Sequence, residues 1–298
     1  MKHSLSARDA FLALLVVAIW GSNFTVARVV METFPPLFMA CLRFALVFFP
    51  LGFFLGWPRP ASWRNVALYG VAIGVGQFGL IFIAMDGWIS PGLASLVVQM
   101  QAFFTIGLSL WRGGERLRAY QLVAFAIALA GMAVIMAHNE KGATALGVLM
   151  CLGAALCWAI GNQASKEAGP AHPIAYVVWA SLFATPALLL LSIALEGWPA
   201  IVRGLSHAGW GTWAIMLWQS LANTVFGFGC WAWLLSRYPA ATVSPMSLLV
   251  PLFGFAASAL WLGEPIQSWK IAATLLVLAG LAVNLFWGRL KTPVSSSP

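Results

Sequence analysis

The chain has 298 residues, of which 61% are hydrophobic and only 8% are charged, and its formal net charge is +8. A soluble domain is nearer half apolar and about a quarter charged, so this composition excludes a pair of ordinary soluble domains. The basic residues stand singly or in twos and threes between apolar runs, a placement that argues against nucleic acid as a partner.

Long apolar runs predict membrane-spanning helices. In lipid, only α-helices and closed β-barrels satisfy their own backbone hydrogen bonds, and barrel strands alternate apolar and polar residues. The runs here are continuous and long enough to cross about 30 Å of hydrocarbon. Ten follow one another along the chain: 9–30, 36–55, 64–86, 91–111, 118–138, 144–165, 172–194, 210–235, 240–261 and 267–288. We expect an all-α integral membrane protein of ten transmembrane helices, with the lipid bilayer as its partner.

Turn residues separate these runs. Adjacent prolines, Pro35 and Pro36, stand between the first two runs. Between the seventh and eighth runs, Gly197, Trp198 and Pro199 are interpreted in the same way, as part of a loop.

Lysine and arginine collect on one predicted side of the membrane. If the N-terminus is inside, eleven fall on that side: Lys2, Arg8, Arg59, Arg64, Arg112, Arg116, Arg118, Lys166, Arg237, Arg289 and Lys291. Four fall on the other side: Arg28, Lys141, Arg203 and Lys270. Cytoplasmic loops hold the basic excess. We therefore expect a multi-pass protein of the plasma (inner) membrane with both termini cytoplasmic, and residues 289–298 as a short cytoplasmic tail.

Self-similarity divides the chain into two halves. Matching positions recur in order: Trp20 with Trp158, Pro35 with Pro173, Phe78 with Phe226, Glu115 with Glu264, and Leu129-Ala130-Gly131 with Leu278-Ala279-Gly280. These matches predict two five-helix repeats, 9–138 and 144–288. Because five is odd, the second repeat enters the membrane from the opposite side, and transporters of this design bind substrate near the midplane between repeats.

Several segments carry a family resemblance: Ala18-Ile19-Trp20-Gly21-Ser22-Asn23-Phe24, Pro35-Pro36-Leu37, Leu42-Arg43-Phe44, Gly114-Glu115-Arg116-Leu117 and Leu262-Gly263-Glu264-Pro265. From about Ala10 to Gly288 the chain resembles the EamA family of the drug/metabolite transporter (DMT) superfamily. Within it, the sequence is similar to YddG-type exporters of aromatic and other neutral amino acids. The resemblance implies a ten-helix secondary transporter, and many such proteins are exporters.

Polar residues deep in the runs, with aromatic neighbours one turn away, are the candidate substrate ligands. Asn23 and Asn162 lie about one turn from Trp20 and Trp158, at nearly equivalent repeat positions; the plainer alternative is that both amides only bridge helices. The full predicted set is Trp20, Asn23, Gln77, Phe78, Ser95, Gln99, Phe103, Trp158, Asn162, Gln219, Asn223, Phe226, Ser244 and Ser247.

Helical spacing decides between neighbouring candidates. Gln219, Asn223 and Phe226 share one face at spacings of four and three. Gln101 lies about 200° from Gln99 on an ideal helix, so at most one of the two is expected to face substrate, and Gln99 is preferred.

Three other groups of residues are interpreted more plainly. Most tryptophans lie near helix ends, where aromatic belts belong. Pro245 and Pro251 each free a backbone carbonyl, either in a cavity wall or in a packing kink. Arg43 is a basic residue well inside a run, and we interpret it as a structural partner of backbone carbonyls or helix ends, although such residues are functional candidates by default.

The absence of mid-helix carboxylates favours a neutral or zwitterionic substrate, because a cation would need a buried counter-ion. We expect alternating-access export of small metabolites, foremost amino acids including aromatic ones, by a monomer or weak homodimer without cofactor or metal. Another DMT permease, for example for a purine, is the alternative. An intramembrane enzyme and a channel are remote, since catalytic motifs and filter loops are not seen.

Overall fold

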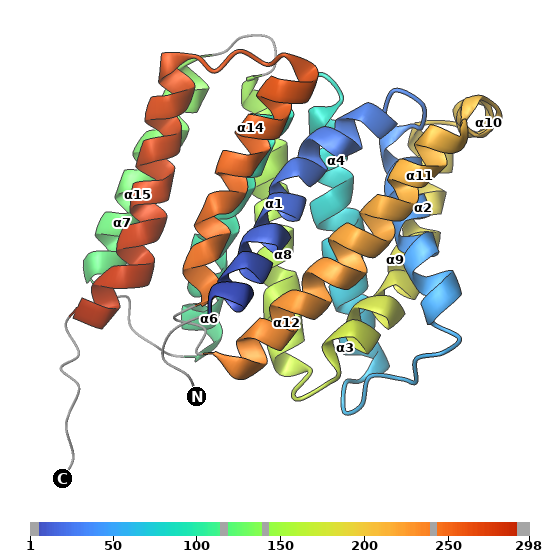
Figure 1. The fold of residues 1–298 in the computed structure, drawn as a ribbon, viewed down its shortest axis with the longest axis horizontal. Helices are drawn as coiled ribbons and strands as arrows, with labels where there is room; N and C mark the ends of the chain where they lie inside the picture. The colour runs from blue at the N-terminus through green and yellow to red at the C-terminus, as the bar shows by residue number, and fades with distance from the viewer. Residues whose placement is uncertain (1–5, 114–118, 139–142, 239–242, 291–298) are drawn as a thin grey trace.

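The computed structural model describes residues 6–113, 119–138, 143–238 and 243–290 (Figure 1). In these residues the regular secondary structure is helical, with one isolated bridge between Ile89 and Ala143, so the all-α prediction is confirmed. Within the same residues, seven helices are long and apolar enough to cross a membrane, and two shorter apolar helices, Pro36–Leu51 and Met246–Leu262, accompany them. Each of the ten predicted runs overlaps a helix.

The first half of the chain forms five helical rods. The elements are α1 (Ala7–Val30), α2 (Pro36–Leu51), α3 (Trp63–Gly70) continued by η1 (Val71–Gly79) and α4 (Leu80–Met85), α5 (Pro91–Val97) continued by η2 (Val98–Met100) and α6 (Gln101–Gly113), and α7 (Ala119–Ala137). Serine side chains cap the first, third and fourth rods, since Ser6, Ser62 and Ser90 each accept a backbone N–H three residues on.

The second half repeats this order with one addition. The elements are α8 (Ala145–Glu167), α9 (Pro173–Leu195), α10 (Trp198–His207), α11 (Trp210–Trp218) continued by η3 (Gln219–Phe226) and α12 (Gly227–Arg237), η4 (Ser244–Leu249) continued by α14 (Val250–Leu262), and α15 (Ser268–Leu290). The short α10 replaces the loop expected there. The prediction that Gly197, Trp198 and Pro199 form a loop was wrong. Pro199 lies in the first turn of α10, where a backbone N–H would have no hydrogen-bond partner within the helix.

Departures from α-helical geometry occupy corresponding rods of the two halves. The third and eighth rods contain the π-helical segments η1 and η3, and the fourth and ninth contain the 3₁₀ segments η2 and η4. In η4, Pro245 follows the first residue, so that its missing N–H falls in the first turn of the segment.

Two pairs of corresponding rods run antiparallel, α2 with α9 and α7 with α15. The carboxylate of Glu196, just after α9, accepts the N–H groups of Leu37 (2.6 Å) and Phe38 (3.1 Å) at the start of α2. At the opposite end, Trp179 Nε1, near the start of α9, donates to Leu55 O (2.9 Å), just beyond the end of α2. The α7–α15 pair, side by side at the left of Figure 1, is also antiparallel, because His138 stacks on Trp269 with ring centroids 4.7 Å apart.

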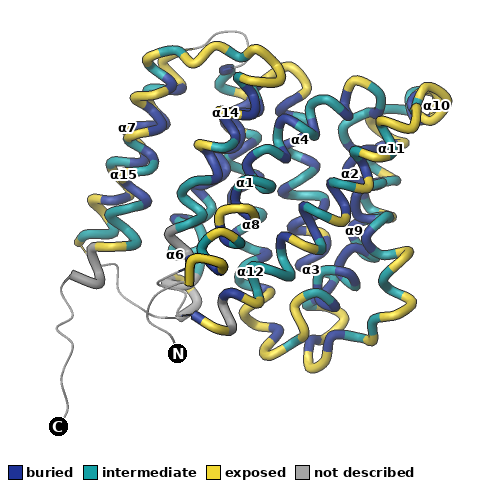
Figure 2. The backbone as a smooth tube through the Cα atoms, viewed as in Figure 1, coloured by how far each residue is buried: buried dark blue, intermediate teal, exposed yellow. Residues whose placement is uncertain are grey.

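Exposed residues occur along the helical rods as well as in the loops (yellow in Figure 2). Large hydrophobic side chains point outward, with Phe54 85%, Trp111 81% and Leu260 81% exposed. A soluble protein would bury such groups, whereas in a membrane they meet lipid tails at no loss.

Glycines let α7 and α15 approach closely. A Cβ on Gly280 would lie 2.5 Å from Ala124 O and 2.9 Å from Ala128 N, and one on Gly131 would lie 3.0 Å from Ala273 O. Both glycines belong to the repeated Leu-Ala-Gly segments, and each one meets the other helix. The repeat therefore marks a reciprocal contact, of the small-residue kind that brings membrane helices together.

We expect Gly280→Ala to destabilise the protein by about 1–3 kcal/mol, because the added methyl group meets backbone that cannot turn aside. Thermal unfolding in detergent, followed by size-exclusion chromatography, measures the change. The matched control is Gly107→Ala in α6, where nothing lies within 4 Å of the added Cβ. Equal melting temperatures for the two variants would contradict the assigned contact.

Candidate functional site

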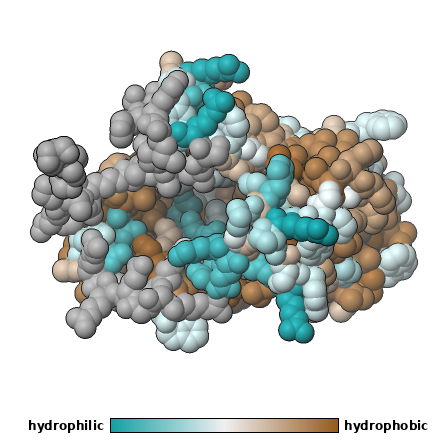
Figure 3. All heavy atoms as spheres, turned by 90° about the horizontal axis from the view of Figure 1, so that it is seen from below, coloured by the Kyte–Doolittle hydropathy of each residue, from teal (hydrophilic) through white to brown (hydrophobic). Residues whose placement is uncertain are grey.

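A central cavity of about 650 Å³ lies between the helical rods. Both halves contribute to its wall, and all four irregular segments take part: Gln77 in η1, Gln99 in η2, Asn223 in η3 and Ser247 in η4. The cavity extends to the loop after α8, at the end of the bundle where α1 begins and α15 ends. Hydrophilic side chains gather near the middle of this end (Figure 3).

Nine of the fourteen predicted site residues lie on the cavity wall: Trp20, Asn23, Gln77, Phe78, Gln99, Trp158, Asn162, Asn223 and Ser247. They include both repeat-related pairs, Trp20 with Trp158 and Asn23 with Asn162. The structure therefore brings these side chains together, and their part in binding stays a prediction.

Two predicted residues lie on the wrong face of their rod. Ser95 is fully buried, donates to Gly92 O at 2.6 Å and sits against Gly254 of α14. Phe103 packs on Phe125 of α7, with ring centroids 5.5 Å apart. A spacing of four residues would place both side chains on the same face as Gln99 if the helix were a regular α-helix. The 3₁₀ turn of η2 interrupts the helix between Ser95 and Phe103, so this spacing does not hold.

The π-helical segment η3 displaces two more. Gln219 is fully buried outside the cavity wall, and Phe226 is 38% exposed and does not line the cavity either. In η3 the hydrogen bonds reach five residues back, so the α-helical spacing behind the prediction does not hold. Phe228 lines the cavity instead. The Ser244 side chain lies outside the described part of the structure.

Gln99 and Gln101 both line the cavity, although helical spacing predicted that at most one of them would face substrate. Gln99 Nε2 donates to Ser247 O (3.0 Å) in η4, whereas Gln101 Oε1 accepts from Asn162 Nδ2 (3.0 Å) in α8. Their rod runs between these two neighbours, and the cavity borders it on both sides.

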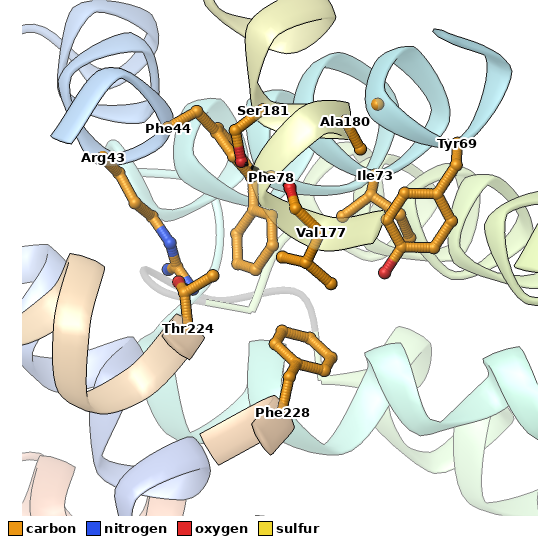
Figure 4. Close-up of a pocket in the computed structure, with 11 residues that line it drawn as sticks. Arg43, Phe44, Tyr69, Ile73, Phe78, Val177, Ala180, Ser181, Thr224 and Phe228 are labelled. Atoms are coloured by element: carbon orange, nitrogen blue, oxygen red, sulfur yellow. Dashed lines mark hydrogen bonds between the residues drawn. The ribbon is translucent and has the colours of Figure 1, made fainter. Parts of the chain in front are cut away.

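A small recess beside the cavity contains the guanidinium of Arg43 (Figure 4). Arg43 is fully buried, donates from one terminal nitrogen to Thr224 Oγ1 at 3.1 Å, and lies 4.1 Å from the centroid of the Phe78 ring. This contact replaces the backbone partners that we predicted for Arg43. Arg43 and Phe78 line the main cavity as well as the recess.

Sequence reasoning also missed two tyrosines on the wall. Tyr69 and Tyr176 line the cavity, pack edge to face at 4.9 Å, and the Tyr176 hydroxyl donates to Asn65 Oδ1 at 2.6 Å. A polar aromatic residue within an apolar run was the available signal, but both tyrosines lie near helix starts, where membrane-interface aromatics are also common.

Two asparagines on the cavity wall carry unpartnered amide oxygens. Asn23 Oδ1 and Asn223 Oδ1 are buried and accept no hydrogen bond within the described residues. Trp20 Nε1 donates to the backbone oxygen of Asn223 at 3.2 Å, which ties α1 to η3 beside them. A buried acceptor without a donor is unfavourable, so these oxygens are suited to a ligand that brings N–H groups.

Two carboxylates, those of Glu196 and Glu264, link the helices at the end of the bundle opposite the cavity mouth. Glu196 accepts from Leu37 N, Phe38 N and the Ser192 hydroxyl (2.5 Å). Glu264 accepts from the hydroxyls of Ser90 and Ser258 and forms an ion pair with Lys270 at 2.8 Å. Each carboxylate joins the second half of the chain to the first at this end of the bundle.

The Glu264 carboxyl, in the loop between α14 and α15, has a lowered pKa. Burial raises the pKa, but the hydrogen bonds from Lys270, Ser258 and Ser90 outweigh it and bring the pKa below the ordinary 4.5. The contribution of this group to stability is therefore complete above pH 4.5 and is lost as the pH falls through the lowered value.

We expect Glu264→Ala to lower stability at pH 7 by roughly 3 kcal/mol, because Lys270 loses its anion while buried. The difference from the wild type should shrink below pH 4.5, where the wild-type carboxylate takes up a proton. Thermal unfolding in detergent at a series of pH values measures both effects. Glu32→Ala, at an exposed position, is the control; a Glu264 effect no larger than the Glu32 effect would contradict the assigned clamp.

Known proteins resemble the chain over nearly its full length. The sequence pattern described as "EamA-like transporter family" matches residues 8–137 and again residues 145–286. A "Probable amino-acid metabolite efflux pump" of Salmonella typhimurium is 39% identical over 293 residues, covering 96% of this chain and 98% of that protein. A protein of the same description in Escherichia coli is 37% identical over 297 residues, covering 97% and 99%.

More distant proteins share the same arrangement. A "Probable terminal-alkyne amino-acid exporter" of Streptantibioticus cattleyicolor is 25% identical over 279 residues, covering 90% of each chain. One solved crystal structure has a TM-score of 0.65 at 17% identity, covering 99% of this chain and 100% of its own. At that identity, the likeness concerns the fold alone.

Proposed function

The chain belongs to the EamA-like transporter family, and we propose that it exports small neutral or zwitterionic metabolites, foremost amino acids including aromatic ones. The observation that carries this proposal is the cavity of about 650 Å³, which has amide, indole and phenyl groups on its wall and no acidic residue among the described lining residues. The volume suits one small molecule. The printed descriptions of two relatives as amino-acid metabolite efflux pumps support the same substrate class.

Family membership confirms the expected resemblance and makes the chain an integral membrane transporter rather than an enzyme. Beyond this, we propose ten membrane-spanning rods arranged as two inverted repeats, 9–138 and 144–288. The antiparallel α2–α9 and α7–α15 pairs support inversion, because corresponding helices of parallel repeats would run the same way. The paired π and 3₁₀ segments support the same correspondence.

The mechanism that we propose is alternating access. In this structure the cavity reaches one end of the bundle, while the Glu196 and Glu264 contacts lie at the other. Rocking of the two halves would break these contacts and close the present mouth around a fixed central site. The mouth carries Arg8, Lys166 and Arg237, so by the positive-inside rule it faces the cytoplasm of an inner-membrane protein.

This orientation predicts which positions an impermeant thiol reagent can reach in intact cells. In a background without the native cysteines, Ser206→Cys at the end of α10 should be labelled, and Pro170→Cys in the loop after α8 should be labelled only after the cells are permeabilised. Both residues are exposed in the structure, so access depends on the side of the membrane. Labelling of position 170 in intact cells would overturn the orientation.

A transport assay tests the function and the site together. Purified protein in liposomes is given radiolabelled neutral amino acids, and Asn162→Ala should raise the KM for a transported amino acid several-fold, because one neutral hydrogen bond is worth about 0.5–1.5 kcal/mol. The neighbouring Gln163→Ala is the matched control, since that side chain lies off the cavity wall and donates to Glu167 at 2.8 Å. A larger effect at Gln163 than at Asn162 would refute the site.

The same assay separates the alternatives. Uptake of a purine without any amino acid would assign the chain to another metabolite. Flux that does not saturate with substrate would favour a channel.

A further inference from the structure

Arg43 is a buried cation with unused hydrogen-bond donors. It is fully buried, and its Nε and one terminal nitrogen have no partner. A guanidinium has five N–H groups, and Thr224 takes one of them. In the described part of the chain no carboxylate pairs with Arg43; the ion pair found there joins Glu264 and Lys270 at the end opposite the cavity mouth. A charge left in this state is strongly unfavourable, so the site lacks an anion.

Arg43 borders the main cavity as well as the recess. Phe78 covers one face of the guanidinium. Figure 4 shows the guanidinium turned toward Thr224, with Phe78 and Phe228 across the recess from α2. The planar fork of an arginine matches a carboxylate better than any other anion-binding side chain does.

Two residues that line the same cavity as Arg43 carry acceptors without a partner. Asn223 precedes Thr224, the residue that holds Arg43, and its Oδ1 has no partner. Asn23 Oδ1, also without a partner, lies on α1, which Trp20 ties to η3 through the 3.2 Å bond to Asn223 O. The wall of one cavity thus includes two asparagines with unpartnered amide oxygens and an arginine with unpartnered N–H donors.

We propose that the cavity recognises the zwitterionic backbone of an α-amino acid. Arg43 binds the carboxylate, and Asn23 Oδ1 and Asn223 Oδ1 accept from the ammonium, while the aromatic wall receives the side chain. This assignment rests on the proposed function and narrows its substrate class from small neutral or zwitterionic metabolites to α-amino acids. It also replaces the structural role that we predicted for Arg43 from the sequence.

The first test uses the unaltered protein. Uptake of radiolabelled L-phenylalanine and L-leucine into proteoliposomes is competed with analogues that lack one charge: phenethylamine and isoamylamine lack the carboxylate, and hydrocinnamate and isocaproate lack the ammonium. Each analogue should compete about 10-fold to 100-fold less well than the parent amino acid, because each one leaves a buried charged or polar group unpaired.

The second test changes Arg43. Arg43→Gln should weaken L-phenylalanine about 10-fold to 100-fold as a competitor and leave phenethylamine, which has no carboxylate, unchanged. A purely structural role would affect both compounds alike. Arg43→Lys keeps the charge without the fork and should fall between the two. Cys41→Ala, on the same helix and off the cavity wall, should behave as the wild type.

The outcomes separate the two proposals. If neither amino acid is transported, the proposed function fails and the inference fails with it. If both are transported but the one-charge analogues compete as well as the parent, only the inference fails. Should Arg43→Gln not fold, the competition data on the wild type still decide.

Discussion

A chain in hydrocarbon must satisfy every backbone hydrogen bond within its own helices or through nearby protein groups. The rods obey this constraint with regular α-helix except at η1, η2, η3 and η4, and all four of these segments border the central cavity. Side chains there take up carbonyl groups: Gln99 donates to Ser247 O, Trp20 to Asn223 O and Thr224 to Gln219 O. Polar side chains beside the cavity therefore donate hydrogen bonds to backbone carbonyl groups of the irregular segments.

Much of the fold could be predicted because lipid leaves few choices. Continuous apolar runs, the turn residues between them and the repeated Leu-Ala-Gly segments led to the helical rods and to the α7–α15 contact. The short α10 was missed, because Gly197, Trp198 and Pro199 have the composition of a loop and also of a helix start. Only the burial of Ile201 and Gly204 against the bundle distinguishes the two.

The sequence predicted which helices would line the cavity better than it predicted which residues of those helices would face it. Residue type and repeat position found Trp20, Asn23, Trp158 and Asn162, which stand in regular helix, where a spacing of three or four keeps its meaning. In the 3₁₀ and π-helical segments a spacing of three or four no longer keeps residues on one face, and for this reason Phe226 does not lie on the cavity wall. Arg43 shows a different limit. Its significance depends on the lack of a paired carboxylate among the residues that the structure describes, and the sequence of one helix cannot show which residues of other helices surround it.

The reciprocal glycines of α7 and α15 also bear on how the two halves of the chain fit together. Gly131 presses against α15 and Gly280 against α7, so each helix offers the other the same small-residue face. A helix face that packs against a copy of itself provides both sides of the contact. The same small-residue contact therefore serves both halves of the chain, whereas their cavity sides differ, with Arg43 in the first half where the second half has Ser181.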